Sequence, residues 1–221
     1  MRILIITGGT IEDDFALEFI KKHHYEYTIA VDRGMEFFYR TGQTPDCIVG
    51  DFDSANPEIL AWFQSQPNIR ILHFEPEKDE TDTELAIRTA IKEGGQELHL
   101  LGASGTRMDH VLGNIQLLGM AMEAGVSCFM IDAYNRVRLL KENYTISKTQ
   151  QFGDYVSLLP FTPRVTGLTL KGFKYPLFQY ELECFHSLGV SNEIQEEEGE
   201  ISFESGILIM VESRDKKIDS K

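Results

Sequence analysis

The stretch ELHLLGASGTRMDHVLGNIQLLGMAMEAGVSCFMI, residues 97–131, decides the fold class. It begins and ends with short apolar segments of strand length, at residues 97–101 and 126–131. Between them, apolar residues recur at helical spacing before a glycine that can stop a helix: Val111, Leu112, Ile115, Leu118, Met122 and then Gly125. A strand, a helix and a second strand in this order predict a βαβ unit with parallel strands.

The same alternation runs through the first 135 residues. Further apolar segments of strand length occupy residues 3–7, 28–31, 47–49 and 69–74. Pro57 suits the first turn of a helix, and TDTE at residues 81–84 fits a capping box at the start of another. Repeated strand–helix alternation predicts a mainly parallel, Rossmann-like α/β domain over residues 1–135.

The pattern changes after residue 135. Short strand-like segments are separated by Gly, Pro and Asn, and we identify no helical pattern among them. These segments are residues 136–140, 144–147, 154–159, 165–171, 200–203 and 208–212. We therefore expect a small antiparallel β domain over residues 136–221.

Charge and composition narrow the class of function. The 221 residues include 35 acidic and 21 basic side chains, a formal net charge of −14. This balance argues against general nucleic-acid binding, but a metal ion and an arginine can still neutralise a nucleotide locally. The three cysteines are far apart, and there is no apolar run of membrane-spanning length and no secretory signal. We expect a cytoplasmic protein with no membrane partner.

Aspartates gather at predicted strand ends, where open parallel sheets bind ligands. The loop GDFDS, residues 50–54, places Asp51 and Asp53 two residues apart, so that on extended backbone both carboxylates point to one side. Asp79 and Asp82 flank the start of the next helix. Four carboxylates brought together require a cation, and hard oxygen ligands suit Mg²⁺. The alternative is that each aspartate serves only as a turn residue or a helix cap.

The loop GASGTR, residues 102–107, precedes the helix of the opening stretch. Backbone N–H groups there and the helix N-terminus can bind an anion, and Arg107 adds a guanidinium group for phosphate. His110 is a candidate general base, and Asn114 lies four residues later on the same helix face. An ordinary turn and a histidine with a local hydrogen bond are the simpler explanations, and the chain has no Walker A motif.

Two turns of the β domain carry side chains suited to a flat heterocycle. Tyr175 offers an aromatic face for stacking, and Ser191 and Asn192 offer polar contacts. Ordinary turn chemistry with a core aromatic residue would produce the same pattern.

Taken together, these motifs resemble the thiamine pyrophosphokinase (thiamine diphosphokinase) family in its bacterial form. The resemblance covers nearly the whole chain, and the motifs follow the family's order. They are the Asp32-x-Gly34 turn, PDCIVGDFDS at 45–54, DETD at 79–82, GASGTRMDH at 102–110 with Asn114, SLLP at 157–160, GLTLKGFKYPL at 167–177 and SNE at 191–193.

The resemblance implies an α/β ATP-binding catalytic domain, a thiamine-binding β-sandwich domain, and a homodimer with its active site at the subunit interface. The implied reaction transfers the pyrophosphoryl group of ATP to the hydroxyl of thiamine, giving thiamine diphosphate and AMP. Asp51, Asp53 and Asp82 are expected to hold Mg²⁺, with Asp79 in support. The residues expected to bind ATP are Asp32, Gly34, Gly105, Arg107, Asp109, His110 and Asn114, and those expected to bind thiamine from the partner subunit are Tyr175, Ser191 and Asn192.

The chain departs from the family pattern at two positions. Thr106 stands where related sequences often have a second glycine, and Tyr175 stands where eukaryotic members tend to have tryptophan. Two other functions remain open. One is a Mg²⁺-dependent phosphatase or a nucleotidyl or glycosyl transferase, and the other is a non-catalytic nucleotide- or vitamin-binding sensor.

Overall fold

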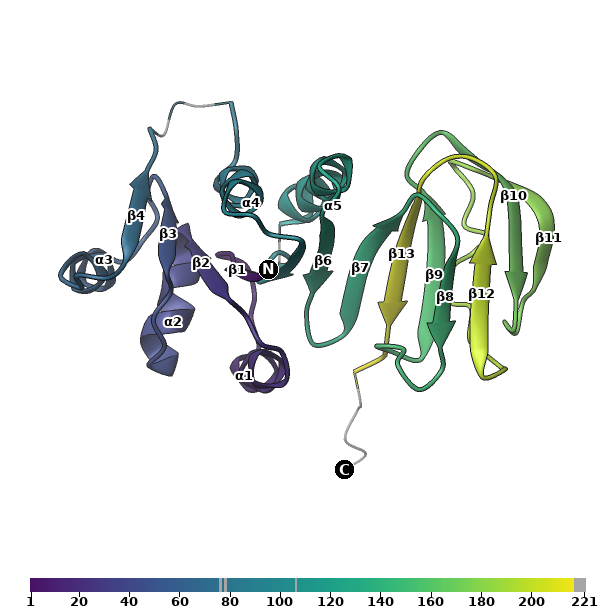
Figure 1. Cartoon of the computed structure of the whole chain (residues 1–221), viewed down its shortest axis with the longest axis horizontal. Coiled ribbons are helices and arrows are strands. Elements are labelled where there is room, and N and C mark those ends of the chain that lie inside the picture. Colours follow the sequence, from purple (N-terminus) through teal and green to yellow (C-terminus); the bar gives the residue numbers. More distant parts are fainter. Residues whose placement is uncertain (76, 78, 106, 217–221) are drawn as a thin grey trace. The chain divides into compact units, whose positions relative to one another are not determined.

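The computed structural model in Figure 1 describes residues 1–75, 77, 79–105 and 107–216. The chain divides into two compact units, and each is described separately. Unit 1 is Met1–Ala133, and unit 2 begins at Tyr134. No helix in the described ranges is long and apolar enough to cross a membrane.

Unit 1 contains a parallel sheet of six strands in the order β4-β3-β2-β1-β5-β6. The chain runs outward from β1 to β4 and then returns to place β5 on the other side of β1. The strand order therefore reverses between β1 and β5, which is where such sheets bind ligands. The strands are β1 (Arg2–Ile6), β2 (Tyr27–Val31), β3 (Cys47–Gly50), β4 (Arg70–His73), β5 (Glu97–Leu101) and β6 (Ser127–Ile131).

Helices lie on both faces of this sheet, with α4 and α5 on one face and α1 and α2 on the other (Figure 1). Two of the expected helix starts are confirmed. Asn56 accepts hydrogen bonds from two backbone N–H groups of α3, and Thr81 accepts one from Glu84 at the start of α4. The helices are α1 (Asp13–Lys22), α2 (Met35–Thr41), α3 (Pro57–Gln64), α4 (Asp82–Lys92) and α5 (Met108–Glu123), with a one-turn 3₁₀ helix η1 (Asp32–Gly34).

Unit 2 is a sandwich of two antiparallel sheets, β7-β13-β9 and β11-β10-β12-β8. Side chains from both sheets share one core, for example Val156 and Met210 from the first and Leu168 and Ile201 from the second. The described residues from 134 to 216 contain no helix. The strands are β7 (Asn135–Leu140), β8 (Tyr144–Ser147), β9 (Tyr155–Pro160), β10 (Arg164–Lys171), β11 (Leu177–Glu183), β12 (Glu198–Ser202) and β13 (Leu208–Ser213).

The predicted fold class, a mainly parallel α/β part followed by an antiparallel β-sandwich, is confirmed. Two elements were not expected. Helix α2 has only seven residues, too few for a clear periodic pattern. Strand β11 is an exposed edge strand whose pairing with β10 is irregular, and Gln179 within it has a φ of 47°.

Candidate functional site

A cavity of about 480 Å³ lies at the carboxyl ends of the strands of unit 1. The loops after β1 and β5 both contribute to it, so it occupies the point where the strand order reverses. Its lining residues are Thr7, Gly8, Gly9, Val31, Asp32, Arg33, Ser54, Thr81, Asp82, Thr83, Gly102, Ala103, Ser104, Gly105, Arg107, His110, Val111 and Asn114.

Asp32 begins the η1 turn and faces this cavity. Its Oδ2 accepts a hydrogen bond from the Ser54 hydroxyl at 2.6 Å, whereas its buried Oδ1 has no hydrogen-bond partner among the described residues. Burial raises the pKa of Asp32, the Ser54 bond opposes this, and the nearby Asp82 and Asp51 carboxylates raise it further. Three acidic side chains therefore act on one another here.

The η1 turn packs directly against the end of β1. A side chain at Gly34 would overlap the carbonyl oxygen of Ile6, so only glycine allows this approach. Gly34 therefore places Asp32 beside the loop after β1. In the structure, the role of Gly34 in the Asp32-x-Gly34 turn is therefore a packing role.

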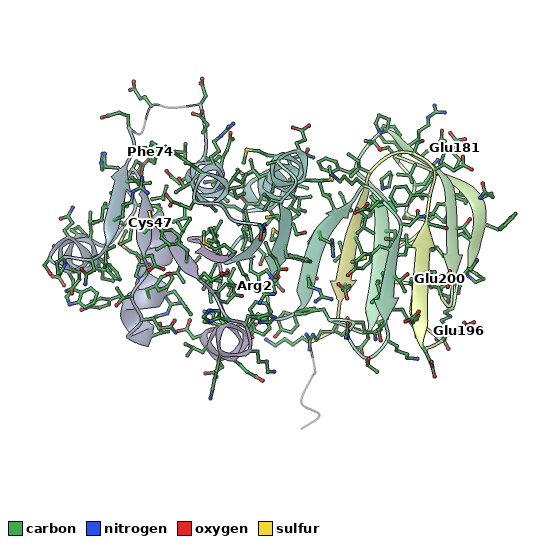
Figure 2. The ribbon with its side chains drawn as sticks, in the orientation of Figure 1. Arg2, Cys47, Phe74, Glu181, Glu196 and Glu200 are labelled. Atoms are coloured by element: carbon green, nitrogen blue, oxygen red, sulfur yellow. The ribbon has the colours of Figure 1, made fainter. Side chains whose placement is uncertain are left out.

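The loop after β3 differs from the extended geometry that we expected. Phe52 has a φ of 64°, and the Asp53 N–H donates to Asp51 Oδ1 at 3.1 Å, so the chain turns at this point. The expectation that Asp51 and Asp53 share one side of an extended strand is therefore wrong. The backbone N–H of Phe74 donates to the carbonyl of Gly50 at 3.1 Å, which holds the base of the loop to the end of β4; Phe74 is labelled in Figure 2.

The four predicted catalytic aspartates have different environments. Asp82 lines the cavity at the start of α4, and Asp51 is half-buried; both carboxylates raise the pKa of Asp32. Asp53 and Asp79 are exposed and do not line the cavity. Among the described residues, no group of three or more His, Cys, Asp or Glu side chains is arranged to hold a metal ion. The unpartnered Oδ1 of Asp32 and the adjacent carboxylates nevertheless fit a hard cation.

The loop between β5 and α5 is anchored through three successive carbonyl groups. Gly102 and Ser104 accept hydrogen bonds from the backbone N–H groups of Gly9 and Thr10, at 2.9 and 3.0 Å. Ala103 accepts one from the Asn114 side chain at 2.7 Å. Because these oxygens are used inside the fold and α5 begins directly after the loop, the loop and helix N-terminus are suited to an anion.

Arg107 is paired within the chain. Its guanidinium donates to both carboxylate oxygens of Asp109, at 2.6 and 3.2 Å, and lowers the pKa of that carboxyl to about 2. Asp109 also accepts the backbone N–H of His110 at 2.9 Å. Arg107 and His110 line the cavity, whereas Asp109 does not. To bind phosphate, the Arg107 guanidinium must therefore either contact the phosphate and Asp109 together or break its hydrogen bonds to Asp109.

In unit 2, Asn192 uses its side chain to fix Tyr175. The Asn192 amide accepts from the Tyr175 N–H at 3.0 Å and donates to the Tyr175 carbonyl at 2.8 Å. Tyr175 itself is 59% exposed, with the Lys174 ammonium 5.6 Å from its ring centroid. Ser191 is exposed in a left-handed turn, with a φ of 57°, and its N–H donates to the Ser157 hydroxyl. Buried Asn192 is thus placed to position Tyr175, while Tyr175 and Ser191 are accessible.

Several residues that line the cavity were not predicted as site residues from the sequence. The most prominent are Thr7, Gly8 and Gly9 after β1. Ser54 and Ser104 also line the cavity; they lie within the motifs at 45–54 and 102–110, but no role was predicted for either. The rule that ligands bind at strand ends would have identified the first three, because they follow the first predicted strand directly. Neither serine had a comparable signal, since each depends on a carboxylate distant in the sequence.

Comparisons with known proteins agree with this arrangement. A family model described as the thiamin pyrophosphokinase catalytic domain matches residues 20–130, and one described as its vitamin B1 binding domain matches residues 143–208. The thiamine pyrophosphokinase of Bacillus subtilis (strain 168) is 34% identical over 189 residues, covering 85% of this chain and 87% of that protein. The chain belongs to the thiamine pyrophosphokinase family.

Solved structures of the thiamine pyrophosphokinase family share the fold over almost the full length. The crystal structure of the B. subtilis protein superimposes with a TM-score of 0.86 at 32% identity, covering 98% of this chain and 100% of that one. A family protein from Enterococcus faecalis gives 0.83 at 30% identity, with 98% and 100% covered. The predicted family is confirmed. Thr106, one of the two departures from the family pattern, lies outside the described residues.

Proposed function

We propose that the chain is a thiamine diphosphokinase, which transfers the pyrophosphoryl group of ATP to the hydroxyl of thiamine and forms thiamine diphosphate and AMP. The observation that carries this proposal is the cavity at the carboxyl ends of β1 and β5, which is lined both by Asp32 and Asp82 and by the loop between β5 and α5, in a chain of this family. In the reaction, the thiamine oxygen bonds to the β-phosphorus, the bond from that phosphorus to AMP breaks, and the hydroxyl proton is released.

The phosphates of ATP bind at the loop between β5 and α5 in this proposal. The anchored carbonyls of Gly102–Ser104 leave backbone N–H groups, including that of Gly105, and the α5 N-terminus to face the anion. Arg107 contributes its charge by replacing part of its hydrogen bonding to Asp109 with hydrogen bonding to phosphate. Asn114 holds the loop, and Asp32 and His110 line the nucleotide site. Gly34 supports the site by placing Asp32, and Asp109 supports it by holding Arg107. Alignment and charge neutralisation by these groups are the main requirements of phosphoryl transfer.

Mg²⁺ is the cation that we propose for the acidic group, with Asp51, Asp53 and Asp82 as its ligands, directly or through water, and Asp79 in support. The raised pKa of Asp32, caused by burial and by Asp82 and Asp51, supports a cation there, as does its unpartnered Oδ1. We add Asp32 to the set for this reason. When bound, the ion supplies positive charge to the phosphate oxygens.

Thiamine is proposed to bind against unit 2 of a second subunit in a homodimer. Tyr175 stacks on the heterocycle, Ser191 makes a polar contact, and Asn192 holds the Tyr175 turn. Several large apolar side chains of unit 2 are exposed, including Phe178 at 84% and Phe185, which is fully exposed. This surface supports an association between copies.

One assay tests the proposed function against its alternatives. Purified protein is mixed with ATP, Mg²⁺ and thiamine, and AMP and thiamine diphosphate are followed. We expect both products in equal amounts and neither without thiamine. Phosphate release that does not depend on thiamine would instead identify a phosphatase, and binding of ATP or thiamine without turnover would identify a sensor. We propose a cytoplasmic location, with no nucleic-acid or membrane partner.

A further inference from the structure

Asp132 and Ser104 form a hydrogen-bonded pair beside the phosphate loop. Asp132 directly follows β6 and is half-buried, and the Ser104 hydroxyl donates to its Oδ2 at 2.8 Å. The same serine lines the cavity, and its carbonyl accepts from the Thr10 N–H. Both the backbone and the side chain of Ser104 are therefore fixed. Ser104 lies within the GASGTR motif, but neither Ser104 nor Asp132 is among the predicted site residues.

The hydrogen-bond chemistry of the pair determines what Ser104 can offer a ligand. A serine hydroxyl has one proton and two lone pairs, and an ionised carboxylate can only accept. Because the proton of Ser104 points to Asp132, the hydroxyl presents lone pairs to the cavity. It cannot then donate to a phosphate oxygen, although it lies within the anion-binding loop. It suits a hydrogen-bond donor that arrives with the phosphates.

We propose that Asp132 is a positioning residue: by accepting the proton of Ser104, it makes that hydroxyl a hydrogen-bond acceptor. The donor is an O–H group of the bound Mg²⁺–nucleotide complex, so this proposal rests on the proposed function. Two groups close to bound phosphates have this chemistry. One is a ribose hydroxyl of the nucleotide, and the other is a water molecule on its cation. In either case Asp132 acts through Ser104 and touches no substrate.

The test measures the affinity of the full-length protein for Mg²⁺–ATP by calorimetry in the absence of thiamine. We expect Ser104→Ala and Asp132→Ala each to weaken binding about tenfold, the scale of one hydrogen bond. The double variant should bind no more weakly than Ser104→Ala, because Asp132 acts only through that hydroxyl. Ser104→Thr, which keeps the hydroxyl, should bind nearly as the wild type does. Ser127→Ala and Asp14→Ala, at exposed positions, are the matched controls.

Deoxynucleotides distinguish the two donors. If a ribose hydroxyl is the donor, 2′-deoxy-ATP or 3′-deoxy-ATP will bind the wild type about tenfold more weakly than ATP, and Ser104→Ala will no longer distinguish them. If the donor is a metal-bound water, Ser104→Ala will keep the wild-type preference and will require more Mg²⁺ for half-maximal binding.

Three outcomes overturn the proposal: unchanged affinity in Ser104→Ala, additive losses in the double variant, or an effect seen only when thiamine is present. If Asp132→Ala does not fold, Asp132→Asn replaces it, since it keeps the shape and a weaker acceptor and should lose less than tenfold. The binding assay needs no turnover. Failure of the wild type to make thiamine diphosphate would therefore overturn the proposed function, whereas the binding measurements would still test the role of Asp132 and Ser104.

Discussion

Asp53 is the most direct test of the metal assignment at the scale of a single residue. Its side chain is exposed, and its backbone N–H holds the turn to Asp51. Asp53→Asn removes a charge but keeps the shape and this hydrogen bond, so folding should be unchanged. We expect turnover to fall about a hundredfold or more, measured as AMP formation at saturating Mg²⁺. Asp14→Asn, on exposed surface of α1, should have no effect. Near-normal turnover in Asp53→Asn would remove this residue from the proposed metal ligands.

Tyr175 gives a corresponding test of the thiamine site. Its ring is 59% exposed while its backbone is fixed by Asn192 on both sides. Tyr175→Ala removes the stacking surface without disturbing a buried group, so we expect the KM for thiamine to rise at least tenfold and that for ATP to change less than twofold. Tyr175→Phe keeps the ring and should restore the wild-type KM. Steady-state kinetics with each substrate varied in turn provide the measurement, and equal changes in both KM values would place Tyr175 outside the thiamine site.

Between elements, Asn114 joins helix α5 to the loop after β5. Its side chain is buried and donates to the carbonyl of Ala103, which is also buried. Asn114→Ala leaves that oxygen without this donor, at a cost of about 1–3 kcal/mol in the free energy of unfolding. The loosened loop should also raise the KM for ATP more than that for thiamine. Urea unfolding and steady-state kinetics measure the two effects. Gln116→Ala, an exposed change on the same helix, is the control. A loss of stability with no change in the KM for ATP would show that the loop does not bind phosphate.

At the scale of elements, sequence patterns predict some features of this fold and not others. Long apolar segments and caps such as Thr81 predict elements because hydrophobic burial and local hydrogen bonds act over neighbouring residues. The rule that ligands bind at strand ends likewise indicated Asp82 and Arg107, which both line the cavity. It did not predict the turn at Phe52, because a positive φ in a non-glycine residue depends on its surroundings. Nor did it predict the Ser104–Asp132 pair, because those residues are 28 positions apart.

At the scale of the whole molecule, a network of ionisable side chains links several elements of unit 1. His99, in β5, is only 5% exposed. One ring nitrogen lies 3.0 Å from Glu97, and the other lies 2.7 Å from the Tyr25 hydroxyl. The His23 ring is 5.3 Å away, and Arg2, labelled in Figure 2, is bonded to Glu97. A neutral imidazole satisfies this arrangement by donating to Glu97 and accepting from Tyr25, whose pKa is raised by burial.

This network should make the protein sensitive to acid. Burial is the main cause that lowers the pKa of His99 to about 4, from an ordinary value near 6.5. Below pH 6.5 the unfolded chain therefore binds a proton at this histidine that the folded chain does not bind until about pH 4. The free energy of unfolding therefore falls as pH drops from 6.5 to 4, by about 3 kcal/mol at most from this group. Burial raises the pKa of Glu97, but the hydrogen bond and the charge of Arg2 oppose this and the pKa is lowered, so Glu97 adds a further loss of stability only below its ordinary pKa of 4.5. Urea unfolding between pH 7.5 and 4.5 should show a shallower decline in His99→Gln than in the wild type. His24→Gln, which alters an exposed histidine, should decline as the wild type does. Parallel curves for His99→Gln and the wild type would show that acid acts elsewhere in the fold.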